Sequence, residues 1–282
     1  MSGPAAITLE SSLRAINAVS ERLQRYEAAG VDPTIGPHDN MFQSHRRDHY
    51  FAVGRDAVGV LARAMIQSGV TDFGTVLDLP SGSGRVLRHL VRFLPGSRFI
   101  ASDIDANHVA FCARQFNANV VVSNEQLANV VPSGSADLIW CGSLLTHFDE
   151  RRFATTLCKI VDWLTPGGLA IVTLHGRWSI RRQSMTSYKY MADELFEPVA
   201  AGVAASGFGY NDYGSLDRVG QRAYGLSVSL PSWVLQLVES MEGVQLLDYT
   251  ERGWDNHQDV MVVRKVSITA KPWIFEEQGP DR

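Results

Sequence analysis

The fold is decided by the stretch TVLDLPSGSGRVL, residues 75–87. Its first half is apolar and predicts a buried strand. From Val86 onward the apolar residues recur at three- and four-residue spacing, which predicts a helix. Gly82 and Gly84 permit a sharp turn between the two and let a ligand approach the backbone, because no Cβ stands in the way. The first N–H groups of the helix would point into that turn, so the stretch predicts a nucleotide-binding βαβ unit.

A second strand follows and ends in a carboxylate. Pro95-Gly96 ends the helix, residues 98–102 read as a strand, and Asp103 comes about 20 residues after Gly84, where such units place the carboxylate that holds ribose hydroxyls. The fingerprint for nicotinamide or flavin cofactors has a third glycine, and this chain has Leu87 at that position. An aspartate, Asp78, also stands inside the end of the first strand.

Asp78 before the Gly-x-Gly turn and Asp103 after the next strand resemble the first two motifs of class I S-adenosylmethionine (SAM)-dependent methyltransferases. Later pieces are similar to that class in order and spacing: DLIWC at 137–141, His147 after it, and LTPGGLAIVT at 164–173. The resemblance covers roughly residues 75–175. It favours a methyltransferase over an NAD(P)-dependent oxidoreductase. A SAM-binding scaffold protein without catalysis is a third interpretation.

The resemblance implies an α/β fold with a doubly wound, mostly parallel seven-stranded sheet whose last strand is antiparallel. It also implies SAM as the cofactor. Asp103 would hold the ribose, and either Asn124 or Glu125 would meet the adenine unless this is an ordinary exposed loop. Tyr50 and Arg55 would serve the methionine part. The full set of expected cofactor contacts is Tyr50, Arg55, Asp78, Gly82, Gly84, Asp103, Ile104, Asn124, Glu125 and Cys141.

Three segments are expected in the chain. Residues 1–70 would form N-terminal helices and a cofactor lid, and the amphipathic helix over 5–29 would pack on the domain or against a second copy in a homodimer. Residues 71–270 would form the SAM-binding domain, with an acceptor-binding insertion at 176–230 that contains a helix over 188–205 and an aromatic, glycine-rich loop at 207–214. Residues 271–282 would be a tail.

Histidines at the carboxyl ends of the predicted strands are the candidates for catalysis. Ligands of doubly wound sheets bind at that edge, and His147, His175 and His257 are placed there. Methyl transfer to a hydroxyl needs a group that takes the proton, and histidine suits this because its ordinary pKa lies near neutrality. We therefore expect O-methylation, with His147 ranked first. The alternative for each histidine is a structural hydrogen bond to the backbone.

The acceptor is expected to be a small molecule or carbohydrate. Arginines and Lys189 between residues 177 and 189, together with the aromatic loop, suit hydroxyl and phosphate groups. Two short pieces, at 209–213 and 253–257, resemble methyltransferases of bacterial glycan or secondary-metabolite synthesis. His45 and His49 have the i, i+4 spacing of metal ligands. No matching cluster accompanies them in the sequence, so no metal is predicted.

The composition of the chain disfavours several other classes of protein. The chain has 282 residues, 45% of them hydrophobic, and a net charge of −4, which does not favour binding to nucleic acid or a membrane surface. Its three cysteines are scattered and suit a reducing compartment. The first residues lack the pattern of a signal peptide. We therefore expect a cytoplasmic protein.

Overall fold

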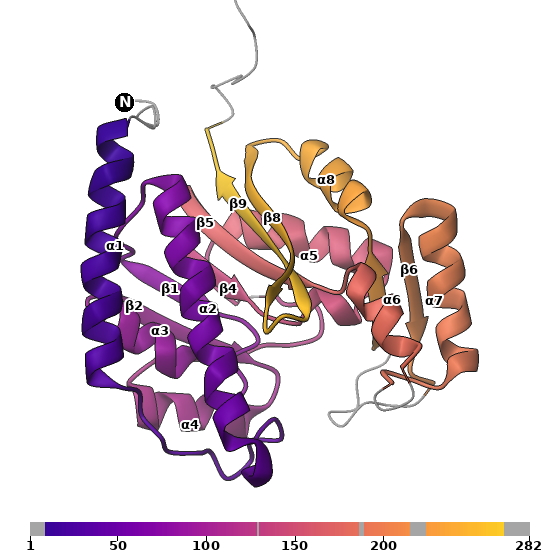
Figure 1. The fold of residues 1–282 in the computed structure, drawn as a ribbon, viewed down its shortest axis with the longest axis horizontal. Coiled ribbons are helices and arrows are strands. Elements are labelled where there is room, and N and C mark those ends of the chain that lie inside the picture. Colours follow the sequence, from indigo (N-terminus) through magenta and orange to yellow (C-terminus); the bar gives the residue numbers. More distant parts are fainter. Residues whose placement is uncertain (1–8, 129, 186–188, 215–223, 268–282) are drawn as a thin grey trace, which may run out of the picture.

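The computed structural model describes residues 9–128, 130–185, 189–214 and 224–267, and most of them surround a seven-stranded sheet of order β3-β2-β1-β4-β5-β9-β8 (Figure 1). The strands are β1 (Thr75–Asp78), β2 (Arg98–Asp103), β3 (Asn119–Val122), β4 (Ala136–Cys141), β5 (Leu164–Leu174), β8 (Val244–Trp254) and β9 (Gln258–Lys265). The tail predicted at 271–282 lies outside the described residues.

The direction of the strands matches the predicted class. β1 to β5 pair in parallel, whereas β9 is antiparallel to both of its neighbours, β5 and β8. β8 therefore runs in the same direction as β1, and its last residue, Trp254, reaches the edge where the parallel strands end. The prediction of a mostly parallel seven-stranded sheet with an antiparallel last strand is confirmed.

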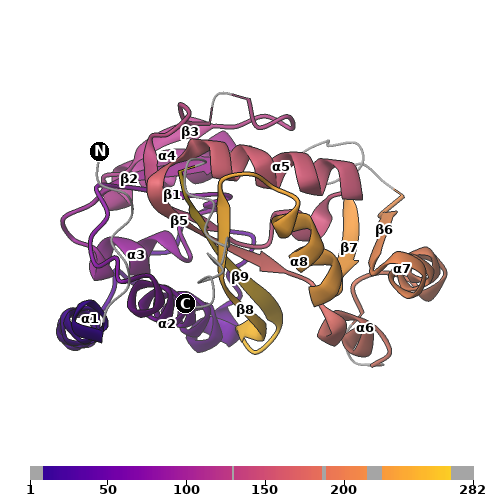
Figure 2. The same cartoon turned by 90° about the horizontal axis from the view of Figure 1, so that it is seen from above.

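Helices cover both faces of the sheet (Figure 2). On one face apolar side chains such as Leu61, Leu90 and Phe111 join a single buried cluster. These come from α2 (Arg47–Ser68), α3 (Leu87–Phe93) and α4 (Ala106–Phe116). On the other face α5 (Glu150–Trp163) and α8 (Pro231–Glu239) bury Phe153 and Val234 in a second cluster. Burial of both faces explains why β1 and β4 read as continuous apolar runs.

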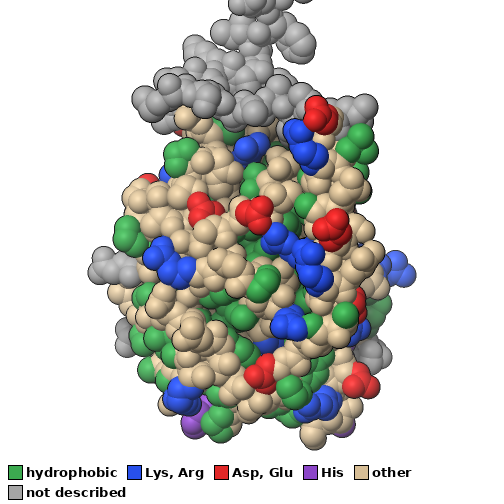
Figure 3. Space-filling model, turned by 90° about the vertical axis from the view of Figure 1, so that its left-hand side faces the viewer, with side chains coloured by type: hydrophobic (Ala, Val, Ile, Leu, Met, Phe, Trp, Pro, Cys, Tyr) green, Lys and Arg blue, Asp and Glu red, His purple; other side chains and the backbone are tan. Residues whose placement is uncertain are grey.

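The N-terminal helix α1 (Leu9–Ala29) lies outside α2 and α3 and ends at Gly30, whose φ is +65°. Its inward side chain Tyr26 hydrogen-bonds the buried His89 on α3, with 2.6 Å between Oη and Nδ1. Leu13 and Ile16 are exposed on its outer side. Figure 3 shows this face of the molecule, where hydrophobic side chains lie among charged ones. The homodimer through this helix stays a prediction.

The segment after β5 forms a smaller unit beside the sheet (Figure 1). It contains α6 (Arg177–Gln183), α7 (Asp193–Ser206), and a two-stranded antiparallel sheet of β6 (Phe208–Asp212) and β7 (Gly225–Ser229). Two expectations were wrong here. The stretch predicted as an aromatic loop is mostly strand β6, because β7 supplies its hydrogen-bonding partner. The helix expected from residue 188 begins only at Asp193.

The remaining elements are short. Two 3₁₀ turns, η1 (Ser44–Arg46) and η2 (Leu145–His147), precede α2 and α5. Among the described residues, no helix combines the length and the apolar composition that a membrane crossing needs.

Candidate active site

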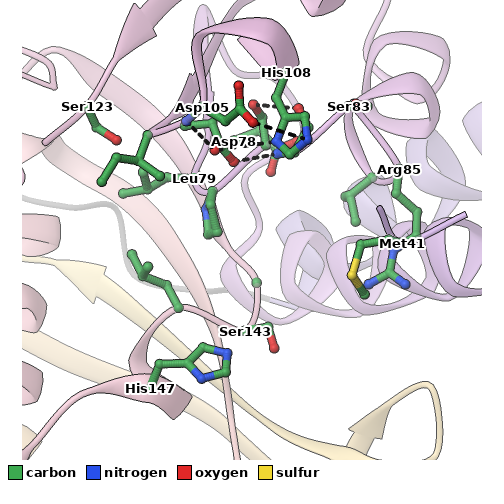
Figure 4. Close-up of a pocket in the computed structure, with 18 of the residues that line it drawn as sticks. Met41, Asp78, Leu79, Ser83, Arg85, Asp105, His108, Ser123, Ser143 and His147 are labelled. Atoms are coloured by element: carbon green, nitrogen blue, oxygen red, sulfur yellow. Dashed lines mark hydrogen bonds and ion pairs between the residues drawn. The ribbon is translucent and has the colours of Figure 1, made fainter. Parts of the chain in front are cut away.

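A first cavity of about 380 Å³ opens at the carboxyl ends of β1, β2, β3 and β4. In Figure 4, Asp78, Asp105 and His108 lie on one side of it, Ser143 and His147 lie opposite, and Met41 and Arg85 close a third side. The predicted residues that line it are Asp78, Gly82, Asp103, Ile104, Asn124, Glu125 and His147. Parallel strands that end together thus bring residues from Asp78 to His147 to one cavity.

Asp78 is the most deeply buried carboxyl group in this cavity. Its side chain is 1% exposed, and its Oδ2 atom has no hydrogen-bond partner in the described part of the chain. Burial, and then the nearby Asp103 carboxylate, raise the pKa of Asp78 well above its ordinary value. A buried polar atom without a partner costs free energy, so this oxygen is suited to a ligand that supplies a donor.

Asp103 holds the glycine turn in place. Its Oδ2 accepts the Gly82 N–H at 2.8 Å, and its Oδ1 accepts the Asp105 N–H at 2.9 Å. The imidazole of His108 lies 3.6 Å from Oδ1. This carboxylate raises the pKa of His108 to about 9, so the imidazole of His108 is charged near neutral pH. A carboxylate has about four acceptor positions, and Asp103 therefore keeps capacity for ligand hydroxyls.

The two glycines of the turn have different roles. Gly82 has φ +51° and open space where a Cβ would stand, and it lines the cavity. Gly84 has φ +76° and lies against Phe116, whose ring would be 2.4 Å from an added Cβ. Gly84 is not among the cavity residues. Glycine is needed at position 84 because α3 packs against α4 there. Gly82, in contrast, leaves room for a ligand to approach the backbone closely.

The loop after β3 closes the far end of the cavity. Ser123, Asn124, Glu125 and Leu127 line it together with Ile104. The loop is held in shape by Asn124 Oδ1, which accepts the Ala128 N–H at 3.0 Å, and by Arg152, which donates to the Glu125 carbonyl oxygen at 2.8 Å. Both side chains predicted for an adenine contact are thus at the cavity.

Four predicted cofactor contacts do not line this cavity, namely Tyr50, Arg55, Gly84 and Cys141. Arg55 is on the outer surface of α2, 3.8 Å from Glu27 in an exposed ion pair. Cys141 is 0% exposed within the apolar cluster beneath the sheet edge, where burial raises the pKa of its thiol. Arg85, the residue directly after Gly84, was missed by the sequence analysis. It lines the cavity, and its guanidinium lies 5.7 Å from the centre of the Trp254 ring.

Tyr50 lies beside the first cavity and not in it. Its ring is 2% exposed, and its hydroxyl donates to Asp39 Oδ2 at 2.5 Å. Asp39, Asn40 and Met41 themselves line the first cavity. The segment predicted as a lid therefore does contribute to the wall, through the loop before η1.

A second cavity of about 730 Å³ adjoins the first and contains all three candidate histidines. The two cavities share five residues, namely Met41, Arg85, Ser143, His147 and Trp254. The turn between β8 and β9, residues 255–257, lines the second cavity as well. α6 and the loop after it contribute Trp178, Arg182 and Tyr190.

His147 stands in the shared wall, on η2. Its Nδ1 lies 2.9 Å from the Gly225 carbonyl oxygen, which can only accept, so Nδ1 carries the proton in this contact. Neutral His147 then has its lone pair on Nε2. The ring stacks on Tyr224, with 4.3 Å between ring centres, and Tyr213 Oη is 3.4 Å from Nδ1. These contacts fix the orientation of the ring and its tautomer.

His175 and His257 lie further along the second cavity. His175 ends β5 and is 5% exposed, and burial followed by the charges of His147 and His257 lowers its pKa well below the ordinary value. Burial, followed by Arg182 and Arg252, lowers the pKa of His257 to about 4. His257 Nε2 is hydrogen-bonded to the Tyr190 hydroxyl. Both imidazoles are therefore uncharged at neutral pH.

A series of hydrogen bonds between polar side chains at the shared wall was also not predicted from the sequence. Thr173 donates to Gln258 Oε1 at 2.5 Å, and Gln258 Nε2 donates to Ser143 Oγ at 2.8 Å. Thr173 Oγ1 in turn accepts the Ser143 N–H at 2.8 Å. Ser143 has a φ of +62°, which is uncommon for a residue with a Cβ. The register of β5 and β9 creates this series of hydrogen bonds, and no local pattern in the sequence indicates it.

The described residues contain no group of three or more histidine, cysteine or acidic side chains arranged to hold a metal ion. His49, one of the pair with metal-ligand spacing, lies 3.1 Å from both carboxylate oxygens of Asp255 instead.

Comparison with known proteins agrees with this geometry. Residues 76–168 match a family model described as "Methyltransferase domain". The chain contains a methyltransferase domain. The matched range includes Asp78, Gly82, Asp103 and His147, and it supports a methyltransferase with SAM as its cofactor over the oxidoreductase alternative. A search of curated proteins found no match.

Solved structures show the same fold. A SAM-dependent methyltransferase from Clostridium acetobutylicum ATCC 824 is 12% identical, with a TM-score of 0.51, and the match covers 89% of this chain and 99% of that one. The PH0226 protein from Pyrococcus horikoshii OT3 is 15% identical, with a TM-score of 0.51, over 80% of this chain and 100% of that one. At these identities the likeness shows the fold alone.

Proposed function

We propose that this methyltransferase transfers the methyl group of SAM to a hydroxyl group of a small-molecule or carbohydrate acceptor. SAM would occupy the first cavity and the acceptor the second. The observation that carries this proposal is the shared wall, where Ser143 and His147 border both cavities. A group transferred between two ligands must pass where their sites meet, and alignment of the two reactants is the main contribution a protein can make.

The residues of the first cavity fit SAM. The unpartnered Asp78 Oδ2 can accept a hydrogen bond from an ammonium group, Asp103 can accept from ribose hydroxyls, and the loop of Asn124 and Glu125 suits the adenine. Arg85, in place of Arg55, would face the methionine carboxylate. The cavity also contains five carboxyl groups, which favour a cationic ligand; they belong to Asp39, Asp78, Asp103, Asp105 and Glu125.

His147 would act as the general base. SAM, when bound, supplies a methyl group on a positively charged sulfur. As the oxygen–carbon bond forms and the carbon–sulfur bond breaks, the hydroxyl proton would pass to Nε2 of His147, since Nδ1 is committed to the Gly225 carbonyl. S-adenosylhomocysteine is the other product. His175 and His257, which are both uncharged, would instead hydrogen-bond the acceptor.

Several earlier expectations remain part of this proposal. They are the role of residues 176–230 in binding the acceptor, an association with glycan or secondary-metabolite synthesis, a cytoplasmic location, and a homodimer through α1. Tyr213 lines the second cavity, in support of the first of these.

Titration calorimetry with SAM tests the cofactor site. Asp103→Ala should weaken binding by about 1.5–3 kcal/mol, the range for a hydrogen bond to a charged group. Arg55→Gln, on the outer surface of α2, is the matched control and should bind as the wild type does. Unchanged affinity in Asp103→Ala, or tight NADH binding by the wild type, would contradict the proposal.

A further inference from the structure

We infer that the acceptor carries a negatively charged group, a carboxylate or a phosphate, which pairs with Arg182 in the second cavity while the acceptor hydroxyl meets His147. This inference rests on the proposed function and specifies the chemical class of its acceptor.

Charge is divided unequally between the two cavities. The first contains five carboxyl groups against three cationic side chains, those of Arg85, Arg152 and His108. The second has three cationic side chains of its own, those of Arg46, Arg182 and Lys189, and one carboxylate, Asp255. The cavities thus differ in sign and meet at one wall. A cationic cofactor in the first and an anionic acceptor in the second would match this division.

Among the described residues, Asp255 is the only carboxylate that lines the second cavity, and it already has partners. Both oxygens of Asp255 lie 3.1 Å from His49 Nε2, and its backbone N–H donates to Asp56 at 2.5 Å. Lys189 forms an ion pair with Asp193 on the outer side. Of the three cationic side chains, Arg46 and Lys189 are exposed, whereas Arg182 is half-buried, so Arg182 is the one best placed to meet an acidic group inside the cavity. A guanidinium also matches the planar geometry of carboxylate and phosphate groups.

The surroundings of Arg182 indicate a positive potential. Its guanidinium lies 5.5 Å from the centre of the Tyr190 ring, on the wall that also holds His257 and His175. After burial, the charge of Arg182 contributes to the lowered pKa of both histidines. The positive charge of Arg182 thus acts on both histidines across a poorly solvated region, and it would act in the same way on a ligand bound there.

The other walls suit the rest of such an acceptor. The rings of Trp178 and Tyr190 offer surfaces for an aromatic or sugar ring, and the uncharged histidines offer hydrogen bonds to hydroxyl groups. The acidic group and the reacting hydroxyl would then be held at different points, Arg182 and His147. Two-point attachment fixes the hydroxyl in line with the methyl group.

Matched pairs of probes test the inference on the protein saturated with S-adenosylhomocysteine. Calorimetry would compare 4-hydroxybenzoate with 4-hydroxybenzamide, and glucose 6-phosphate with glucose, so that the pairs distinguish an aromatic carboxylate from a sugar phosphate. In at least one pair the anion should bind about tenfold more tightly or better. Arg182→Gln should remove this preference. Arg181→Gln should retain it, because Arg181 is exposed on the same helix and does not line the cavity.

No preference in either pair, or an equal loss of preference in the two variants, would overturn the inference. Neither variant should change the affinity for S-adenosylhomocysteine. The probes are also titrated into the protein without S-adenosylhomocysteine. If S-adenosylhomocysteine fails to bind while the free protein shows the anion preference and its dependence on Arg182, the proposed function fails and the anion site stands. If S-adenosylhomocysteine binds and neither anion is preferred, the inference alone fails.

Discussion

At the scale of single residues, His147 differs from the other two histidines in what surrounds it. It borders both cavities, and the Gly225 carbonyl fixes its tautomer. His175 and His257 are held uncharged by burial and by neighbouring positive charges, which makes each of them a poorer proton acceptor. His147 therefore has the position and the orientation that a general base requires.

His147→Ala should lower turnover by roughly 10²–10⁴-fold, the usual contribution of a general base. The rate is measured as methyl transfer to an acceptor that the wild type turns over, and SAM affinity should stay within about twofold of the wild type. His257→Gln is the control and should retain the pH profile even if it raises KM. If His147→Ala keeps both the rate and the acidic limb of the pH profile, His147 is structural and His175 becomes the candidate.

The position of a residue could be predicted from the sequence where a strand ends at that residue, but not where the rotation of the residue around a helix decides its position. Asp78 and Asp103 end adjacent parallel strands, so their meeting follows from topology. Arg55 follows Tyr50 by five residues, which at about 100° per residue turns it roughly 140° away on the same helix. Tyr50 faces inward and Arg55 faces solvent, as this angle requires. The phase of α2 could have excluded Arg55 from the site.

At the scale of elements, the glycine turn joins the cofactor site to the packing of two helices. Gly84 brings α3 close to α4, with Phe116 filling the space where a Cβ would stand. Asp103 secures the other half of the turn through the Gly82 N–H. The turn is thus shaped by packing on one side and remains open to a ligand on the other.

Gly84→Ala should destabilise the fold by about 1–3 kcal/mol from its left-handed φ alone, with the contact to Phe116 adding to this cost. Denaturant unfolding measures the change. Gly96→Ala is the control, since its φ is not in the left-handed region and nothing lies within 4 Å of an added Cβ. Equal stability of the two variants would show that the Phe116 contact and the turn conformation are not required.

Helices and strands could be predicted where residues close together in the sequence determine them. The alternation of strand and helix from β1 to β5 follows from apolar spacing and from the turns between them. β6 was missed because its partner β7 lies outside the local window and because its sequence, FGYND, is rich in residues that favour turns. The series of hydrogen bonds from Thr173 through Gln258 to Ser143 was missed for the same reason, since strand register creates it.

At the scale of the whole molecule, buried histidines make stability depend on pH. Burial, followed by neighbouring arginines, lowers the pKa of His89 to about 3, and the pKa of His257 is about 4. The unfolded chain binds these protons near pH 6.5, whereas the folded chain does not. The stabilisation is therefore complete above about pH 6.5 and is lost as the pH falls toward the folded pKa values.

His89→Gln should reduce this acid sensitivity. Each such histidine removes about 2 kcal/mol of unfolding free energy between pH 7 and pH 5, at about 1.4 kcal/mol per unit below pH 6.5. The variant should lose about 2 kcal/mol less than the wild type over that interval, measured by denaturant unfolding at both pH values. Comparing the two proteins cancels the opposite effect of Asp78 and Asp259, whose pKa values are raised. An identical pH dependence would show that His89 is not held uncharged.

The charge of the molecule is arranged around one edge of the sheet. Carboxyl groups gather where β1, β2 and β3 end, cationic side chains gather beyond β5, and His147 lies between them. This arrangement assigns the two reactants of the proposed reaction to separate cavities with a common wall.

A crystal structure of the protein with S-adenosylhomocysteine would test this assignment. We expect the ribose at Asp103, the adenine against the loop of Asn124 and Glu125, and the sulfur facing the wall of Ser143 and His147, with the second cavity left open for an acceptor. Density for S-adenosylhomocysteine in the second cavity, or a sulfur atom turned away from His147, would contradict it.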